Sequence, residues 1–170
     1  MNFTVEGLLI DYYRTYKQEL HIDLLEESPY EEVFKNGRIK LHYREEYVKK
    51  SVDRCKRIWE DCGFSDDLSL IYEKKEKIYR GEEQRFLESC ITKKEYMMYP
   101  FVWECFEDEQ VLGRRYVWNV QDLNFEKLAR EIILSDIGGN LALAESVFLV
   151  DNKVGKVFFL YDDRGILLFT

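Results

Sequence analysis

Apolar residues recur at helical spacing in three stretches of the chain. They form one stripe in each of the ranges 5–16, 47–62 and 125–133. Side chains three and four residues apart share one face of an α-helix, so each stretch predicts an amphipathic helix with its stripe toward a core. Gly63 and Gly138 follow the second and third stretches, and we expect them to end those helices.

Local signals predict two shorter helices. Ser28-Pro29-Tyr30-Glu31 has the form of a capping box with proline at the first helical position. Asn36-Gly37 would then end the helix that this box begins. Residues 82–88 are expected to form another short helix.

Alternation of polar and apolar residues, or short apolar runs between turn residues, predicts the strands. They are expected at residues 38–43, 68–72, 96–106, 114–120, 147–150, 155–161 and 166–169. The last three strands form a meander because only short turns separate them. Helices and strands alternate without a regular βαβ repeat, so we predict an α+β fold: a mainly antiparallel sheet, packed amphipathic helices and a C-terminal three-stranded meander.

Two features predict which strands lie at the edge of the sheet. Pro100 lacks the backbone donor that a central strand needs, so the strand 96–106 is expected at an edge. The run of Lys and Glu after Tyr72 also favours an edge or an exposed ribbon. His42 is expected to point toward solvent together with Lys40.

Composition limits the class of protein. The chain has 170 residues, 46% of them hydrophobic, and no linker or repeat, which predicts one globular domain over residues 1–170. A formal net charge of −8 disfavours nucleic acid and anionic membranes as partners and favours a basic partner. No signal peptide and no run of about 20 apolar residues is present. We therefore expect a cytoplasmic protein.

Cysteine and histidine give little indication of metal or nucleophilic chemistry. No CxxC pair is present and the two histidines are isolated, so no metal site and no cofactor are predicted. Cys90 would need His21 or His42 nearby, or a helix N-terminus, to act as a nucleophile. We expect a buried thiol instead. Paired acids such as Glu26-Glu27 and Glu82-Glu83 are expected on solvated faces.

The segment with the most chemistry is Tyr161-Asp162-Asp163-Arg164-Gly165, between two apolar strands. Aspartates accept backbone hydrogen bonds in tight turns, and glycine would take the positive φ that closes the hairpin, so turn formation explains the segment. As a binding site, one aspartate would orient Arg164 toward a carboxylate or phosphate. A divalent cation between the two aspartates is a weaker alternative, since adjacent side chains in a strand point in opposite directions.

Two other segments contain residue types that are found in ligand-binding sites. Arg114-Arg115-Tyr116-Val117-Trp118 could stack on single-stranded nucleic acid. Strand alternation explains it better, with Tyr116 and Trp118 in the core and Arg115 on the other face, where Glu104, Glu107, Asp108 and Glu109 would offset its charge. Gly138-Gly139-Asn140 follows a helix and lacks the spacing of a dinucleotide fingerprint.

The C-terminal meander with its Tyr161-Asp162-Asp163-Arg164-Gly165 turn resembles a family of uncharacterised bacterial proteins known as a domain of unknown function. The resemblance extends upstream as a pattern through the helix 125–133 and the helix-strand unit 47–72. Members of that family commonly continue after the glycine with a small apolar residue and then an acid, whereas this chain continues with Ile166-Leu167-Leu168-Phe169. The resemblance implies no activity.

Three classes of function stay open, and one of them is a purely structural domain that self-associates through an exposed strand edge. The first is a non-enzymatic bacterial cytoplasmic protein whose acidic, aromatic surface binds a basic protein, in the manner of small acidic immunity proteins. Tyr161, Asp162, Asp163 and Arg164 are the candidate binding residues, and no catalytic residue is predicted. The alternative is a small-molecule-binding or hydrolytic enzyme with its site around Asp162, Asp163 and Arg164. The sequence does not give the oligomeric state.

Overall fold

A computed structural model describes residues 19–74, 81–104 and 110–170 of the chain. The helix predicted in residues 5–16 lies outside these ranges, as do the later part of the Lys/Glu run, at 75–80, and residues 105–109 of the predicted long loop. No helix in the described ranges is both long and apolar enough to cross a membrane.

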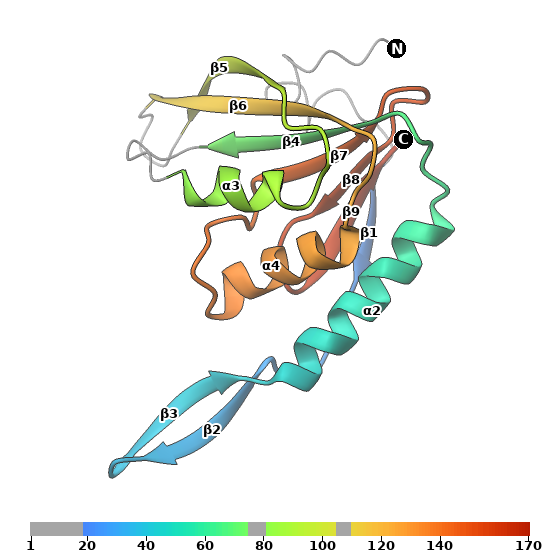
Figure 1. The fold of residues 1–170 in the computed structure, drawn as a ribbon. Helices are drawn as coiled ribbons and strands as arrows, with labels where there is room; N and C mark the ends of the chain where they lie inside the picture. The colour runs from blue at the N-terminus through green and yellow to red at the C-terminus, as the bar shows by residue number, and fades with distance from the viewer. Residues whose placement is uncertain (1–18, 75–80, 105–109) are drawn as a thin grey trace.

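A seven-stranded sheet forms the centre of the molecule, in the strand order β1-β9-β8-β7-β4-β6-β5 (Figure 1). Its strands are β1 (Glu19–Asp23), β4 (Leu68–Lys74), β5 (Tyr96–Glu104), β6 (Gln110–Val120), β7 (Val147–Asp151), β8 (Val157–Leu160) and β9 (Gly165–Phe169). All neighbouring strands are antiparallel. The predicted α+β fold with a C-terminal meander is confirmed, and Pro100 lies in an edge strand as expected.

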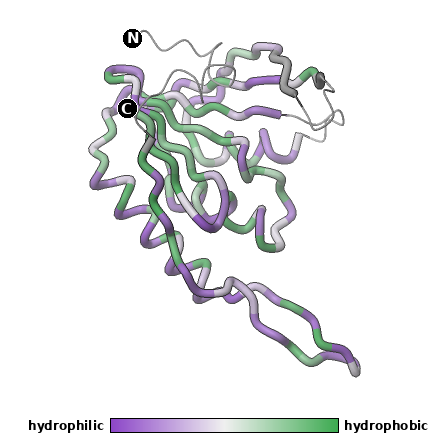
Figure 2. Tube along the Cα trace, turned by 180° about the vertical axis from the view of Figure 1, so that it is seen from behind, coloured by the Kyte–Doolittle hydropathy of each residue, from purple (hydrophilic) through white to green (hydrophobic). Residues whose placement is uncertain are grey.

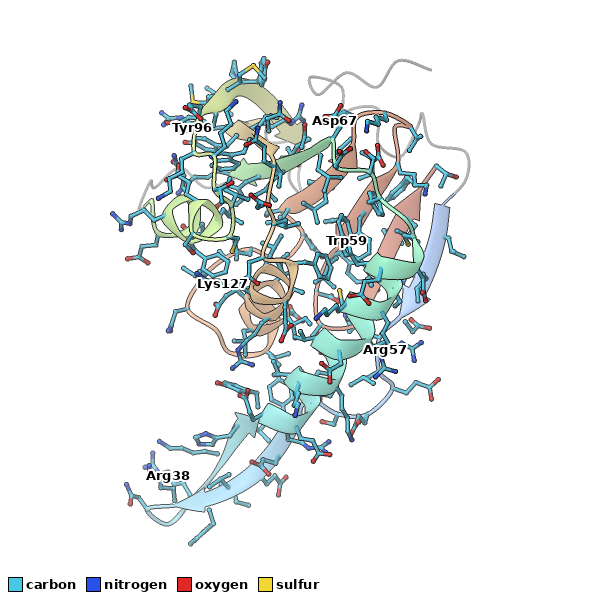
Figure 3. The ribbon with its side chains drawn as sticks, turned by 45° about the vertical axis from the view of Figure 1, so that its right-hand side comes forward. Arg38, Arg57, Trp59, Asp67, Tyr96 and Lys127 are labelled. Carbon is cyan, nitrogen blue, oxygen red and sulfur yellow. The ribbon has the colours of Figure 1, made fainter. Side chains whose placement is uncertain are left out.

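Three helices cover one face of this sheet (Figure 1): α2 (Glu45–Asp61), α3 (Glu82–Glu88) and α4 (Phe125–Ile137). Their apolar stripes join the buried sheet residues of that face in one core. Trp59 of α2 points into this layer (Figure 3), where its ring stacks on Phe64 and Phe125 with centroids 4.3 and 4.8 Å apart. Asn124 caps α4 by accepting a 3.1 Å hydrogen bond from the amide of Lys127.

The opposite face of the sheet is also apolar. Its buried residues are Ile71, Val117, Phe148, Val150, Val157, Phe159 and Phe169. Figure 2 views the sheet from this side and shows strongly hydrophobic colouring along the central strands. Strands buried on both faces have continuous apolar runs instead of alternation, and this explains why β7 and β8 are apolar at every position but the last of β7.

Residues 30–43 form a separate two-stranded hairpin, β2 (Tyr30–Lys35) and β3 (Arg38–Tyr43), which projects away from the body of the molecule (Figure 1). The helix predicted after Ser28-Pro29 is therefore wrong. Asn36 and Gly37 have φ of 53° and 74°, the conformation of a two-residue hairpin turn, so Asn-Gly joins two strands here and ends no helix.

Strand β4 lies at the centre of the sheet, so the edge position predicted for the Lys/Glu run is wrong for its first two residues, Glu73 and Lys74, which are buried. Glu73 pairs in register with Arg115 of β6 and accepts a 2.9 Å hydrogen bond from its Nε atom. The side chains expected to offset Arg115 from across the β5–β6 hairpin, at 104 and 107–109, lie outside the part of the chain that the structure describes; within that part, an acid of β4 pairs with Arg115.

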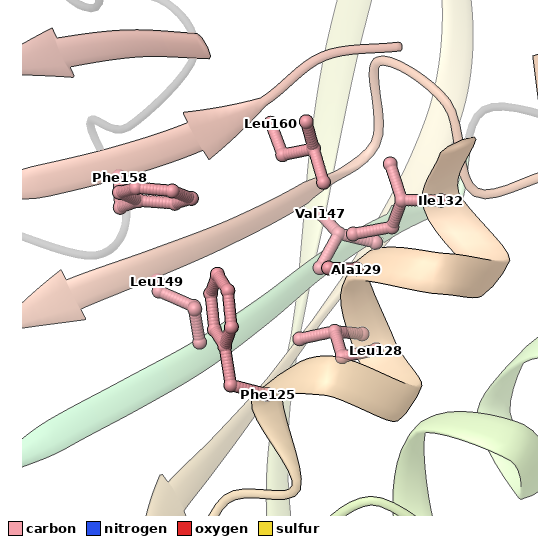
Figure 4. Close-up of a pocket in the computed structure, with 8 residues that line it drawn as sticks. All are labelled: Phe125, Leu128, Ala129, Ile132, Val147, Leu149, Phe158 and Leu160. Atoms are coloured by element: carbon pink, nitrogen blue, oxygen red, sulfur yellow. The ribbon is translucent and has the colours of Figure 1, made fainter. Parts of the chain in front are cut away.

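The interface between α4 and the strands β7 and β8 contains a small apolar gap (Figure 4). Its volume is about 10 Å³, which is the space of a single water molecule. Phe125, Leu128 and Leu149 are among the side chains that line it. A ligand of metabolite size does not fit in this gap.

Candidate functional site

The turn between β8 and β9 is organised by Asp162. Its Oδ1 atom accepts a 2.7 Å hydrogen bond from the backbone amide of Arg164, and its Oδ2 atom accepts one of 2.7 Å from Arg164 Nε. Arg164 Nη2 contacts the same carboxylate oxygen. Asp162 is buried whereas the Arg164 side chain is 69% exposed. The aspartate therefore accepts the backbone hydrogen bond that the turn interpretation predicted, and it also orients the guanidinium, as the binding-site interpretation expected.

Gly165 serves the turn differently from the prediction. Its φ is not positive, so the expected left-handed conformation is wrong. A Cβ atom at this position would instead lie 2.5 Å from the hydroxyl of Tyr161 and 3.0 Å from Nε2 of His21. These two groups are hydrogen-bonded at 2.6 Å directly beside the glycine. The glycine is needed for close approach of a Tyr161–His21 pair to the backbone.

Asp163 points toward the helices. Its Oδ2 atom accepts a 2.8 Å hydrogen bond from the Tyr47 hydroxyl of α2, which also lies 3.2 Å from the main-chain oxygen of Asp163. Burial and the neighbouring acid raise the pKa of Tyr47, so the phenol stays protonated and donates. Asp136, in the last turn of α4, lies beside Asp163, with one carboxylate oxygen of each within 4.8 Å of the other.

The pKa of Asp163 is raised to about 6. Burial is the main cause, and the hydrogen bond and negative charge of Asp136 raise it further. The hydrogen bond from Tyr47 acts in the opposite direction. Two neighbouring carboxyl groups are more stable with one shared proton than with both groups ionised, because two like charges at that separation repel. Asp163 consequently changes its protonation state near neutral pH, unlike an ordinary aspartate.

The same acids could hold a divalent cation. One carboxylate oxygen from each of Asp136, Asp162 and Asp163 lies within 4.8 Å of the others. Oxygen ligands at such spacing suit Ca²⁺ or Mg²⁺. However, the guanidinium of Arg164 already neutralises Asp162, and the raised pKa of Asp163 keeps this acid protonated below about pH 6. Both effects reduce the negative charge that would attract a cation.

An open groove lies beside this cluster, with a volume of about 750 Å³. Its walls come from the segment after β1, the base of the β2–β3 hairpin, α2, the end of α4 and the 162–164 turn. The lining residues are Asp23, Leu25, Glu26, Glu27, Pro29, Tyr30, Tyr47, Asp136, Ile137, Asp163 and Arg164. Five of them are acids and one is basic. The site is concave, amphipathic and acidic, which suits a cationic ligand with an apolar or aromatic part.

Asp151 provides a contrast within the same molecule. It is buried like Asp163, but its carboxylate accepts hydrogen bonds of 2.7 and 2.8 Å from the amide and hydroxyl of Ser65. The amides of Lys153 and Val154 donate to it as well, at 3.0 and 3.3 Å. Burial raises the pKa of Asp151, but these donors together lower it further, so the net shift is downward. Asp151 is thus a structural acid that supports the β7–β8 turn, whereas Asp163 faces the groove.

The family described as "Domain of unknown function (DUF3885)" has a model that matches residues 12–170. The chain belongs to this family. No match was found to a curated protein or to a solved structure. All residues that line the groove fall within the matched range, so the groove is built from the DUF3885 domain itself.

Within this DUF3885 domain, the other predicted candidates lie away from the groove. Cys90 donates to the carbonyl of Phe86 at 3.5 Å, and burial raises the pKa of its thiol, which disfavours a nucleophile as expected. Tyr116 and Trp118 are buried in the helix-side core, and Arg115 lies on the other face of β6, so the strand interpretation of this segment is confirmed. Gly138 and Gly139 end α4 as predicted.

Of the four candidate binding residues, the structure brings Asp163 and Arg164 to the groove and places Asp162 behind Arg164 as its partner. Tyr161 faces His21 instead, with ring centroids 5.8 Å apart. No local pattern in the sequence indicated that Tyr47 or Asp136 belongs to the site. In the sequence, Tyr47 is indistinguishable from the other apolar positions of the α2 stripe. It lies 116 residues from Asp163 in the chain, so no local pattern connects the two.

Proposed function

We propose that this DUF3885 domain is a non-enzymatic binding protein of the bacterial cytoplasm whose acidic groove binds a basic protein partner. The observation that carries this proposal is the gathering of five acids around an open groove that also offers Tyr30, Leu25 and Pro29 as apolar contacts. Acids at the rim accelerate the encounter with a cationic surface, and a tyrosine supplies an anchor once water is displaced.

The charge of the groove is concentrated where solvent can reach it. Asp23, Glu26, Glu27 and Asp136 are exposed. Among the described residues, Glu27 lies 2.9 Å from Arg44 and 3.4 Å from Lys50, and Asp23 lies 3.7 Å from the ring of His21. The formal net charge of −8 reinforces the local field. The three described cysteines are free thiols, in keeping with a reducing compartment.

A charge-reversal experiment tests this function. Glu26→Lys/Asp136→Lys places two cations at the groove, and we expect loss of a basic partner that the tagged wild-type protein retains from bacterial lysate at moderate salt. Asp53→Lys/Glu60→Lys makes the same charge change on exposed positions of α2 outside the groove. Retention by this control, with a salt-dependent affinity in calorimetry of the purified pair, supports the proposal. Equal binding by all three proteins would refute it.

A second candidate is an enzyme or binding protein for a small carboxylate or phosphate at the same turn. It is favoured by the protonation of Asp163 near neutral pH, since a general acid-base group needs a pKa close to the working pH. The exposed guanidinium of Arg164, held by Asp162, is suited to an anionic group of such a ligand.

Thermal unfolding with a panel of small carboxylates and phosphates tests this alternative. A ligand of the turn should raise the melting temperature of the wild-type protein by a few degrees, and Arg164→Ala should abolish the shift while circular dichroism shows an intact fold. Asp162→Asn should weaken the shift, because it releases the guanidinium from its orientation. A shift that persists in Arg164→Ala would place the ligand elsewhere.

A further inference from the structure

The β2–β3 hairpin presents an exposed apolar face. In its register, Tyr30 lies opposite Tyr43 and Phe34 lies opposite Ile39, while Leu41 lies opposite Glu32. Residues directly opposite each other share a face, and alternate pairs point to the same side. One face of the hairpin therefore gathers five large apolar side chains and Glu32, which lies at the middle pair of that face; Phe34 and Leu41 are 75% and 65% exposed. A hairpin of two strands is only marginally stable alone, so such a face calls for a partner.

The outer end of the hairpin is basic. Lys35 and Arg38 pair across the Asn-Gly turn, and Lys40 follows on the same side of β3 as Arg38. Figure 3 shows Arg38 at the outer end of the hairpin, far from the sheet. These three cations stand out in a chain whose formal net charge is −8. A foreign basic protein that approached this end would be repelled by it.

The inner end of the same hairpin opens onto the acidic groove. Tyr30, the first residue of β2, lines the groove. Burial is the main cause that raises the pKa of Tyr30, and the negative charges of Asp136 and Asp163 raise it further. The base of the hairpin is tied to the groove wall by Arg44, whose amide donates to the carbonyl of Pro29 at 2.7 Å and whose guanidinium contacts Glu27. The hairpin thus runs from an acidic inner end to a basic outer end, and the three cations of the outer end lie on the face opposite to the apolar one.

We propose that two copies of this chain dimerise by packing these hairpins face to face in opposite directions. A two-fold axis through the middle of the apolar faces then brings Lys35 and Arg38 of each copy to the acidic groove of the other. Each hairpin strand has six residues and is about 20 Å long, so the outer end reaches the base of the partner hairpin when the faces overlap fully. In such an isologous interface each contact between the two copies forms twice, because the two-fold axis relates them.

The observations favour a second copy over another occupant because the complementarity lies within one chain. Along one hairpin, acids lie at the inner end, apolar side chains lie between, and cations lie at the outer end. A second copy in the opposite direction places its cations beside these acids and its apolar side chains beside the apolar ones. The groove of each copy is then completed by residues of the other. This inference goes beyond the proposed function and does not require it; an external basic partner would compete with Lys35 and Arg38 for the groove.

Sedimentation velocity of the full chain tests the dimer over a range of micromolar concentrations. The wild-type protein should show a concentration-dependent dimer. Phe34→Glu should raise the dimer dissociation constant at least about tenfold, because it replaces the most exposed of the large apolar side chains on this face with a carboxylate. Val154→Glu, at an exposed apolar residue of the β7–β8 turn, is the matched control and should leave the dimer unchanged. A wild-type monomer at every concentration, or a dimer that Phe34→Glu leaves intact, would overturn the proposal.

A charge exchange between two variants tests the direction of packing. Lys35→Glu/Arg38→Glu alone and Glu26→Lys/Asp136→Lys alone should each be monomeric, because each pairs like charges at both grooves. An equimolar mixture should form a heterodimer, since both of its grooves then meet opposite charge. Dimers of the single variants, or a mixture that stays monomeric while the wild type dimerises, would overturn the placement of the basic end in the groove.

Discussion

Arg115→Met should lower the free energy of unfolding by about 3–5 kcal/mol. Arg115 and Glu73 are 1% and 0% exposed, and the guanidinium Nε and Nη2 atoms lie 2.9 and 2.8 Å from Oε1 of Glu73. Methionine has a similar length but no charge, so the buried carboxylate loses the cation that faces it across β4 and β6. Urea denaturation at neutral pH, monitored by tryptophan fluorescence, measures the loss.

The double variant Glu73→Leu/Arg115→Met separates the ion pair from simple loss of packing. Removing both charges should recover most of the lost stability, since the desolvation cost of the carboxylate disappears with it. Lys56→Met breaks the solvent-exposed pair of Lys56 with Glu126 and should change stability by less than about 1 kcal/mol. A single Arg115→Met variant as stable as this control would contradict the assigned role of the pair.

Asp163→Asn should stabilise the protein at pH above about 6 and leave its stability nearly unchanged near pH 4. The pKa of Asp163 rises from 3.8 to about 6 on folding, so the folded state binds the proton more tightly. Raising the pH through this window therefore erodes the stability of the wild-type protein, by up to about 3 kcal/mol at 1.36 kcal/mol for each pKa unit. Asparagine can accept from Tyr47 and donate to Asp136, as the protonated acid does, but does not ionise.

Asp151→Asn is the matched control, since it makes the same substitution at a second buried acid whose pKa is lowered on folding. The stability that Asp151 provides is present above the pKa of its unfolded form and is lost as the pH falls, so this variant should be less stable than the wild type at neutral pH. Urea denaturation of both variants across this pH range measures the two opposite signs. An Asp163→Asn variant less stable than the wild type at pH 8 would contradict the shared proton.

An acid that weakens the fold when it ionises is informative about the site. Asp163 could be replaced by asparagine at a gain in stability, which is the trade-off that binding and catalytic sites commonly show. Asp151 shows no such conflict, because Ser65 and the turn amides satisfy its charge. The contrast directs functional tests to the groove beside Asp163 and away from the β7–β8 turn.

Local patterns in the sequence determined the helices α2 and α4 and the C-terminal meander, because periodic burial repeats every 3.6 residues in a helix and turn residues mark the ends of strands. They also indicated that one aspartate of the turn orients Arg164, and the structure shows that this aspartate is Asp162, two residues away. The Asn36-Gly37 signal was present too, but Ser28-Pro29 competed with it as a helix start, and the short segment between them has no period long enough to decide.

Tertiary structure alone decided what surrounds the turn. Tyr47, Asp136 and the acids after β1 come from three separate elements, and nothing in their own neighbourhoods marks them as parts of one groove. The same is true of Glu73 and Arg115, whose pairing depends on β4 lying beside β6. Strand order sets the contact between Glu73 and Arg115. Burial beside the carboxyl group of a distant element raises the pKa of Asp163, because the two acids share one low-dielectric space.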